Sequence, residues 1–461
     1  MGRLTALLAL ALLACGAPLP FETPDIILVS IDSLRADHLG SYGYPKPTSP
    51  FLDRLADDGV RFENAVSSTS WTLPAHAGLF TGLYDSAHGL VRDGLRLAGG
   101  HRTLAERLRE AGYRTAGFYS GPYLHPSFGL NQGFDVYRSG MTAMPELGDE
   151  AARDFALNDL ATHREITGPV VARQVAEWLD ALPAETGPVF LFVHLFDVHY
   201  DYVPPVEYLS LFDPDYQGTL RPGRLALNPA VHEDMDPRDL EHLVARYDGE
   251  IRFTDDTVKW ILADFGSHRD PNNTILVVTS DHGDEFFEHG DKGHRRTLYD
   301  EVVRVPLIFR WPNGIAGGRA VPDQVRLIDV LPTLLALARV APGEGVQGRD
   351  LSPLLRGGAL PPEDALLELY TPEGTIRALR TNETKLFWQN GRHSSVDLAN
   401  DPAERRHRQA EGPDLRPMRK RLAELYKRSR ALREERVGRR AVPSETDPAT
   451  RERLRSLGYV E

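Results

Sequence analysis

The chain has 461 residues, of which 26% are charged and 41% hydrophobic, as is typical of a globular protein. Its length allows one large α/β domain with a smaller appended unit. The formal net charge of -13 argues against a nucleic-acid partner, because binding to phosphate backbones requires clustered positive charge.

The N-terminal segment predicts an exported, lipid-anchored protein. Met1-Gly2-Arg3 precedes an apolar run, Leu4 to Ala14, which has the charge and length of a secretory signal and is too short to span a bilayer. The end of this run, Leu12-Leu13-Ala14-Cys15-Gly16, resembles a bacterial lipobox, in which the Cys is lipidated and becomes the first residue of the mature chain. We therefore predict a signal peptide over 1–15, lipidation of Cys15 and a linker over 16–24.

Cys15 is the only Cys in the chain, so a lipidated protein would have no free thiol. Gly16 is unlike an inner-membrane retention signal, which favours the outer membrane of a bacterial cell envelope. The alternative is an ordinary signal peptide in which Cys15 is incidental.

Strands and helices alternate from Asp25 to Arg310, which indicates βαβ units. Runs such as DIILVSI at 25–31 are apolar and β-branched throughout, as in strands buried on both faces of a parallel sheet. The fold class predicted for residues 25–345 is α/β, a doubly wound and mostly parallel sheet flanked by helices. The expected strands are 25–31, 60–62, 114–119, 189–195, 274–280 and 305–310, and the expected helices are 49–58, 103–111, 170–182 and 241–265.

Three further segments complete the predicted organisation. Residues 203–235, rich in Pro, Asp and Leu, indicate a long irregular insertion. Short apolar runs at 375–380, 385–389 and 396–398 predict a small antiparallel sheet within a C-terminal subdomain over 346–410. The tail over 411–461 is basic, and the helix predicted over 414–436 would pack on the domain with a solvated face, binding to anionic lipid being the alternative.

Five segments carry the residues suited to chemistry. They are Val29-Ser30-Ile31-Asp32-Ser33-Leu34-Arg35-Ala36-Asp37, the run from Ser70 to Gly82, Phe196-Asp197-Val198-His199-Tyr200-Asp201-Tyr202, Thr279-Ser280-Asp281-His282-Gly283-Asp284-Glu285, and Glu288 to Leu307. Together they resemble the metal-binding and signature segments of the sulfatase family in the alkaline phosphatase superfamily. The resemblance extends from Asp25 to Leu398-Ala399-Asn400-Asp401-Pro402 and includes Leu457-Gly458-Tyr459.

The resemblance implies a divalent metal bound by Asp32, Thr72, Asp281 and His282. The candidate metals are Zn, Mn and Ca, and the imidazole favours Zn or Mn over Ca. The resemblance also assigns His199, Lys292 and His294 to the substrate anion and the leaving group. Taken in isolation, Asp32 and Thr72 would equally suit helix N-caps, and we interpret His194 as a core residue with satisfied ring nitrogens.

Thr72 departs from the family signature. There a Cys or Ser two residues before Pro is oxidised to formylglycine, but Thr72 stands two residues before Pro74 and His76 replaces the signature Arg. Thr is no known source of that aldehyde, so we expect no formylglycine. A Thr hydroxyl is nearly inert at neutral pH and would need a metal or a base to become a nucleophile.

The sequence thus predicts a sulfuric ester hydrolase-like enzyme that acts on an anionic sulfate or phosphate ester through unmodified Thr72. A phosphodiesterase, phosphonate hydrolase or phosphoethanolamine-type transferase remains open, because water can cleave a phospho-Thr more readily than a sulfo-Thr. A third hypothesis is a non-catalytic, metal-stabilised binding lipoprotein. A second cation, held by some of His199, Glu285, His289 or His294, would favour a doubly charged phosphate monoester.

Overall fold

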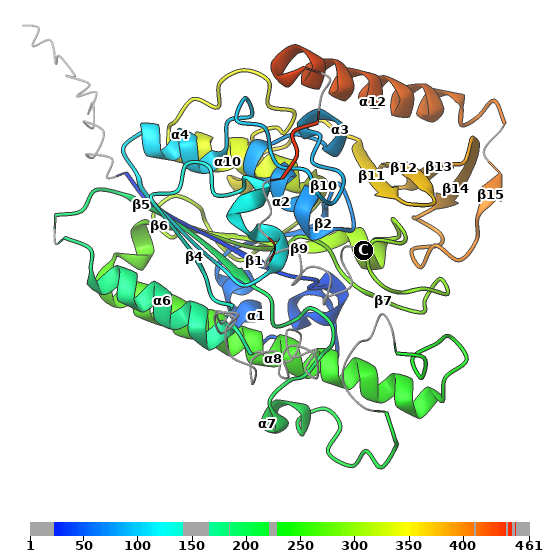
Figure 1. Ribbon diagram of the computed structural model, residues 1–461, viewed down its shortest axis with the longest axis horizontal. Helices are drawn as coiled ribbons and strands as arrows, with labels where there is room; N and C mark the ends of the chain where they lie inside the picture. The colour runs from blue at the N-terminus through cyan, green and yellow to red at the C-terminus, as the bar shows by residue number, and fades with distance from the viewer. Residues whose placement is uncertain are drawn as a thin grey trace, which may run out of the picture.

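A large central sheet with helices on both faces lies beside a smaller sheet covered by a single long helix (Figure 1). The computed structural model describes residues 23–141, 166–183, 185–220, 228–409, 412–438, 441–444 and 448. The predicted signal peptide, Cys15 and most of the tail after 438 lie outside these residues.

The large sheet has the strand order β10-β2-β9-β6-β1-β5-β3-β4. Its ladders are parallel except for those of β9, which runs antiparallel to both β2 and β6. The predicted α/β class with a mostly parallel sheet is therefore confirmed. The strands are β1 (Asp25–Ile31), β2 (Val60–Val66), β3 (Arg114–Tyr119), β4 (Val136–Ser139), β5 (Val189–Leu195), β6 (Thr274–Ser280), β9 (Arg304–Arg310) and β10 (Arg319–Arg326).

Helices cover both faces of this sheet because alternate strand residues point to opposite sides. Ile26 and Leu28 of β1 pack in the same core as α2 (Thr72–Thr81), α4 (Leu104–Glu110) and α10 (Val330–Leu337). Ile27, Val29 and Ile31 pack with α1 (Pro50–Asp58), α6 (Gly168–Asp180) and α8 (Pro237–His268) on the other face (Figure 1). Shorter elements are α3 (Asp85–His88), α7 (Val206–Leu209), α9 (Asp300–Val303), α11 (Ser352–Leu355), β7 (Glu285–Phe286) and β8 (Lys292–Gly293).

The register of three central strands gathers polar residues at one edge of the sheet. β1 pairs with β6 so that Ile31 is opposite Ser280, and the next residues, Asp32 and Asp281, leave the sheet at the same level. On its other side β1 pairs with β5, with Ser30 opposite His194. This edge is the carboxyl end of the parallel strands, where open α/β sheets bind their ligands.

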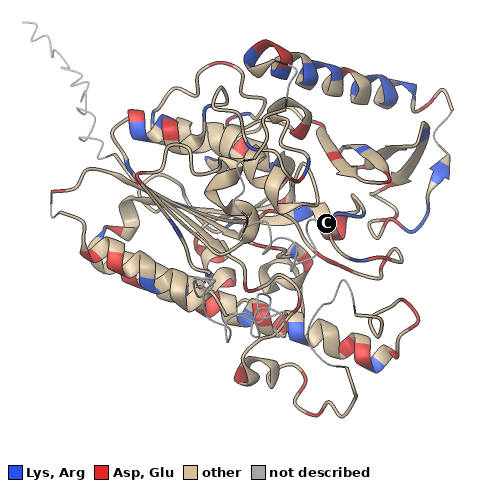
Figure 2. Cartoon of the chain, viewed as in Figure 1, with Lys and Arg blue, Asp and Glu red and all other residues tan. Residues whose placement is uncertain are grey.

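The C-terminal unit is an antiparallel sheet with α12 (Arg416–Val437) lying over it (Figure 1). Lys and Arg recur along α12, and Leu422 and Leu425 are its buried apolar residues, so the helix packs on the domain as predicted (Figure 2). The small antiparallel sheet with its helix is also confirmed. Its strands are β11 (Ala365–Thr371), β12 (Gly374–Arg380), β13 (Thr384–Gln389), β14 (Arg392–Asp397) and β15 (Arg408–Gln409).

A buried ion-pair network joins this unit to the one built on the large sheet. Lys385 on β13 is fully buried, and its Nζ lies 2.6 Å from Asp300 Oδ1 and 2.9 Å from Glu404 Oε1. Arg380 on β12 pairs with the other oxygen of Asp300 at 2.6 Å. Asp300 begins α9, directly before β9 of the large sheet, so these contacts fix the small sheet against the larger unit.

We expect Lys385→Ala to lower the free energy of unfolding by about 3 kcal/mol or more, because it leaves buried carboxylates without their cation. Urea unfolding followed by circular dichroism measures the change. The control is Lys420→Ala on α12, whose side chain is 78% exposed and forms only a helical i,i+4 pair, so its loss should stay within about 0.5 kcal/mol. Equal losses in the two variants would contradict the network's role.

Candidate active site

The four residues predicted to bind a metal meet at the edge formed by β1 and β6. The His282 Nε2 atom lies 3.2 Å from the Oγ1 atom of Thr72, which is the first residue of α2. The same nitrogen lies 3.4 Å from Asp281 Oδ2 and 3.7 Å from Asp32 Oδ1. All four side chains are buried. Trp71 occupies the N-cap position of α2, so the alternative that Thr72 is itself a helix cap is wrong.

The spacing of these atoms fits a divalent cation. Four ligands at about 2.1 Å in a tetrahedron stand about 3.4 Å apart, close to the separations measured around His282. The His282 Nδ1 atom lies 3.0 Å from the carbonyl oxygen of Gly283, which can only accept, so Nδ1 carries the proton and Nε2 presents its lone pair. Asp32 Oδ2 and Asp281 Oδ2 are buried without a hydrogen-bond partner among the described residues.

The charges of the cluster also call for a cation. Burial and the neighbouring Asp281 carboxylate raise the pKa of Asp32 well above its usual range. Burial opposes a charged His282, yet the Asp281 and Asp32 carboxylates raise its pKa above the ordinary value. The buried Asp32 and Asp281 carboxylates are thus stabilised by a nearby positive charge, and a divalent cation would supply one.

Two further predicted residues, His294 and His199, line up beside His282. The ring centroids of His282 and His294 are 4.2 Å apart, and those of His294 and His199 are 4.9 Å apart. The Nδ1 atom of His199 lies 2.7 Å from the carbonyl oxygen of Tyr200, so it donates and Nε2 is left as the basic nitrogen of the neutral ring. The structure therefore places both imidazoles predicted for the leaving group next to the metal cluster.

Asp284 holds His294 in this position and was not assigned a role from the sequence. Its Oδ1 lies 2.7 Å from His294 Nδ1, and its Oδ2 accepts a hydrogen bond of 2.5 Å from the Tyr202 hydroxyl. The position of Asp284 in the same acidic segment as Asp281, three residues later, was the available signal.

Lys292, unlike the other predicted site residues, contacts the insertion over 203–235. Its ammonium donates to the carbonyl oxygens of Val231, at 2.5 Å, and Asn228, at 3.3 Å, both in the insertion. Among the described residues it forms no hydrogen bond to Thr72 or to the metal cluster. Its role toward the substrate anion therefore stays a prediction, and its observed contact anchors the insertion.

The interpretation of His194 as a satisfied core residue is wrong. Its side chain is fully buried on β5, but neither ring nitrogen has a hydrogen-bond partner among the described residues. Its Nε2 lies 3.4 Å from Asp32 Oδ2. Burial lowers the pKa of His194 to about 4, so its imidazole is neutral at neutral pH.

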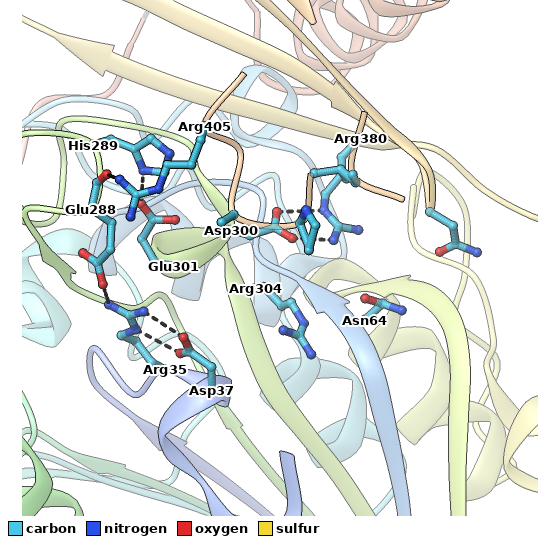
Figure 3. A pocket seen from close by; sticks show the side chains of 14 residues that line it. Arg35, Asp37, Asn64, Glu288, His289, Asp300, Glu301, Arg304, Arg380 and Arg405 are labelled. Atoms are coloured by element: carbon cyan, nitrogen blue, oxygen red, sulfur yellow. Dashed lines mark hydrogen bonds and ion pairs between the residues drawn. The ribbon is translucent and has the colours of Figure 1, made fainter. Parts of the chain in front are cut away.

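A pocket of about 550 Å³ lies at the junction with the C-terminal unit. Figure 3 shows that its charged walls are paired with each other: Arg35 contacts Asp37 and Glu288, and Arg380 contacts Asp300. The nearby group of Glu285, His289 and Glu301 is likewise bonded internally, His289 Nδ1 to Glu301 and its backbone N–H to Glu285. These charges stabilise the junction, which argues against Glu285 and His289 as ligands of a second cation.

Comparison with known proteins gives two family matches. The profile described as "Sulfatase" matches residues 24–340, and the one described as "N-sulphoglucosamine sulphohydrolase, C-terminal" matches residues 287–431. An "Ulvan-active sulfatase" from Formosa agariphila is 26% identical over 345 residues, which cover 72% of this chain and 65% of that protein's own length.

Two solved structures share the fold. One, described as being in complex with its substrate D-glucosamine-2-N,6-O-disulfate, superposes with a TM-score of 0.72 at 19% identity and covers 92% of this chain and 100% of its own. The phosphonate monoester hydrolase of Agrobacterium radiobacter has a TM-score of 0.71 at 24% identity, covering 89% and 96%. These likenesses establish the architecture.

We expect saturating Zn or Mn to raise the thermal midpoint of the chelator-treated protein by about 5 °C, because the metal binds only the folded state. Asp281→Asn should abolish this shift, since it removes a buried ligand charge. Differential scanning calorimetry with and without metal measures it. The exposed variant Asp57→Asn is the control and should keep the full shift; the same shift in both variants would contradict the assignment.

Proposed function

The chain belongs to the sulfatase family, and we propose that it is a divalent-metal-dependent hydrolase of sulfate or phosphate esters with unmodified Thr72 as its nucleophile. Family membership confirms the predicted enzyme class, a sulfuric ester hydrolase-like protein. The observation that carries the proposal is the position of Thr72 Oγ1, 3.2 Å from His282 Nε2 and beside two buried carboxylates.

The cation held by Asp32, Thr72, Asp281 and His282 would lower the pKa of the Thr72 hydroxyl and neutralise oxygens of the bound anion. The N-terminus of α2, which begins at Thr72, adds a partial positive charge at the same point. The Thr72 proton would pass to water, and Oγ1 would then bond to sulfur or phosphorus as the bond from that atom to the opposite ester oxygen breaks. These features together suit an anionic ester substrate.

The leaving oxygen needs a proton, and the two neighbouring imidazoles are placed to supply it. Asp284 holds the Nδ1 proton of His294 and so directs Nε2 of that ring away from itself. The carbonyl oxygen of Tyr200 does the same for His199. A ring that also carries a proton on Nε2 would act as general acid when the ester oxygen leaves, and the neutral ring that remains would act as base when water cleaves the product on Thr72.

A phosphoryl substrate is the second candidate, and His282 favours it. A metal ligand set with an imidazole suits Zn or Mn better than Ca. Water can cleave a phospho-Thr by attack at phosphorus, whereas a sulfo-Thr lacks the elimination route of a formylglycine hydrate. The fold is also that of a phosphonate monoester hydrolase, and phosphodiester cleavage or phosphoethanolamine-type transfer would use the same groups. A non-catalytic binding protein is less well supported, because metal and acid groups are all retained.

We also propose export and lipidation at Cys15, with attachment to a bacterial cell envelope, the outer membrane being favoured. The support is the signal-like run before Cys15 and the lipobox-like residues around it. Within the described residues, no helix is both long and apolar enough to cross a bilayer.

Thr72→Ala should reduce turnover at least about a thousandfold on whichever aryl sulfate, phosphate monoester, phosphodiester or phosphonate ester the wild type cleaves, because it removes the attacking oxygen. Thr72→Ser should keep measurable activity. Turnover is measured with each substrate in the presence of Zn, Mn and Ca. Thr81→Ala, a buried residue of the same helix, is the matched control and should stay close to wild type.

Three results would contradict the proposal. Undiminished turnover in Thr72→Ala would exclude Thr72 as the nucleophile. Mass spectrometry of the peptide containing Thr72 should find an intact or phosphorylated Thr, and an oxidised side chain would overturn the unmodified nucleophile. If the wild type cleaves none of the substrates, the binding protein becomes the better hypothesis.

Full-length protein expressed in a bacterium should partition into the detergent phase, and Cys15→Ser should move it to the aqueous phase, because lipidation requires the thiol. Mass spectrometry of the N-terminal peptide would identify the acylated Cys15. Wild-type protein recovered in the aqueous phase with an unmodified N-terminal segment would contradict the anchor.

A further inference from the structure

A second set of ligand atoms lies against the same two carboxylates. The His194 Nε2 atom is 3.4 Å from Asp32 Oδ2, and the His76 Nδ1 atom is 3.7 Å from Asp281 Oδ2. One ligand atom each from His76, His194 and Asp281 lies within 4.8 Å of the others. These side chains are fully buried or nearly so. The separations again resemble the edges of a tetrahedron about a small cation, about 3.4 Å.

The strand register and the position of α2 bring these groups together. Ser30 on β1 is paired with His194 on β5, and both continue the alternating face that packs against α2. Asp32, two residues after Ser30, extends the same face beyond the strand. His76 projects from α2 onto this point, and its ring lies 4.9 Å from that of His194 at an angle of 77°.

Unsatisfied polar atoms point to a ligand at this place. Both ring nitrogens of His194 and the Oδ2 atoms of Asp32 and Asp281 are buried without a hydrogen-bond partner in the described part of the chain. Burying such an atom unpaired costs about 1–3 kcal/mol. A cation that accepts a lone pair from each of the three residues would satisfy them together.

His76 is arranged so that it can join them. Its Nε2 lies 3.0 Å from Ser30 Oγ, a hydroxyl able to accept that proton, which would leave the lone pair on Nδ1. Its Nδ1 lies 2.9 Å from the Thr72 carbonyl oxygen, which can only accept, so Nδ1 carries the proton of the metal-free ring and a cation bound there would require that proton to move to Nε2. Helix geometry pairs that carbonyl with the backbone N–H of His76 as well, so Thr72 would keep a partner if Nδ1 bound a cation.

The two oxygens of the Asp32 carboxylate face different sets of ligand atoms, one at Thr72 and one at His194. Its Oδ1 faces His282 Nε2 at 3.7 Å, whereas its Oδ2 faces His194 Nε2 at 3.4 Å. A carboxylate with one oxygen toward each of two ligand groups is the arrangement that two-metal sites use as a bridge.

We propose that His76 and His194, together with Asp32 and Asp281, form a second divalent-cation site that shares both carboxylates with the site at Thr72. This proposal rests on the proposed function, in which the first cation is bound at Thr72. Two imidazoles suit Zn or a similar first-row metal. This cation has no nucleophile among its four protein ligands, so it would be structural, and the reaction would take place at the first one, which is bound by Thr72. Two cations over two carboxylates also give the edge a net positive charge, which suits an anionic ester.

Metal content of the full-length protein tests the proposal independently of turnover. Chelator-treated protein is dialysed against Zn and analysed by mass spectrometry for metal, and we expect about two equivalents per chain. Anomalous diffraction at the Zn edge from wild-type crystals should show two peaks, one beside His282 and one between His76 and His194. This measurement requires no variant to fold.

Variants assign the second equivalent. His194→Ala and His76→Ala should each bind about one equivalent, half the wild-type amount, because the ligands of the first site remain. The matched control is His101→Ala: His101 is also buried with neither ring nitrogen paired among the described residues, but it lies outside both ligand groups, so two equivalents should remain.

The outcomes separate the two proposals. One equivalent in the wild type, with a single peak beside Thr72 and His282, would overturn the second site and leave the proposed function intact. No bound Zn and no anomalous peak would overturn the second site, and no binding of Mn or Ca either would also overturn the proposed function. Two equivalents in His194→Ala would also overturn the second site.

Discussion

The structure depends on two carboxylates that the sheet forces to lie side by side in a buried place. β1 and β6 are parallel neighbours in register, so Asp32 and Asp281 leave their strands together, and their side chains are at most 1% exposed. Like charges in such a space repel and are poorly solvated, which raises the pKa of Asp32. A proton or a positive charge at this edge therefore stabilises the two carboxylates.

Three elements bring further polar groups to these carboxylates. α2 brings Thr72 and the positive end of its dipole, the segment after β6 brings His282, and β5 brings His194. The hydroxyl of Thr72 needs this setting to act as a nucleophile, because an isolated Thr hydroxyl is a poor one. The setting of Thr72 is thus compatible with the unmodified nucleophile that we propose.

The sequence predicted the architecture well where the local pattern is strong. The bounds of β1, β3, β5 and β6 agree with the predicted ranges, since continuous apolar runs mark buried parallel strands. β10 was not predicted because it is an edge strand that contains Pro322 at a register shift, and edge strands tolerate such residues without a clear pattern. Among the site residues, Lys292 could not be placed from its motif, since its contacts come from the insertion.

What the sequence determined by itself is the set of chemical groups: the aspartates that follow two buried strands, His282 beside the second of them, and Thr72 in the segment that resembles the family signature. Each lies in a segment whose local pattern is sufficient to recognise it. What only the tertiary structure decided is which side chains lie close enough to contact the same carboxylates. His76 and His194 are 118 residues apart, and nothing local distinguishes His194 from a packed core residue. Strand register and the packing of α2 bring them to the same carboxylates, because those are long-range contacts that a local pattern does not encode.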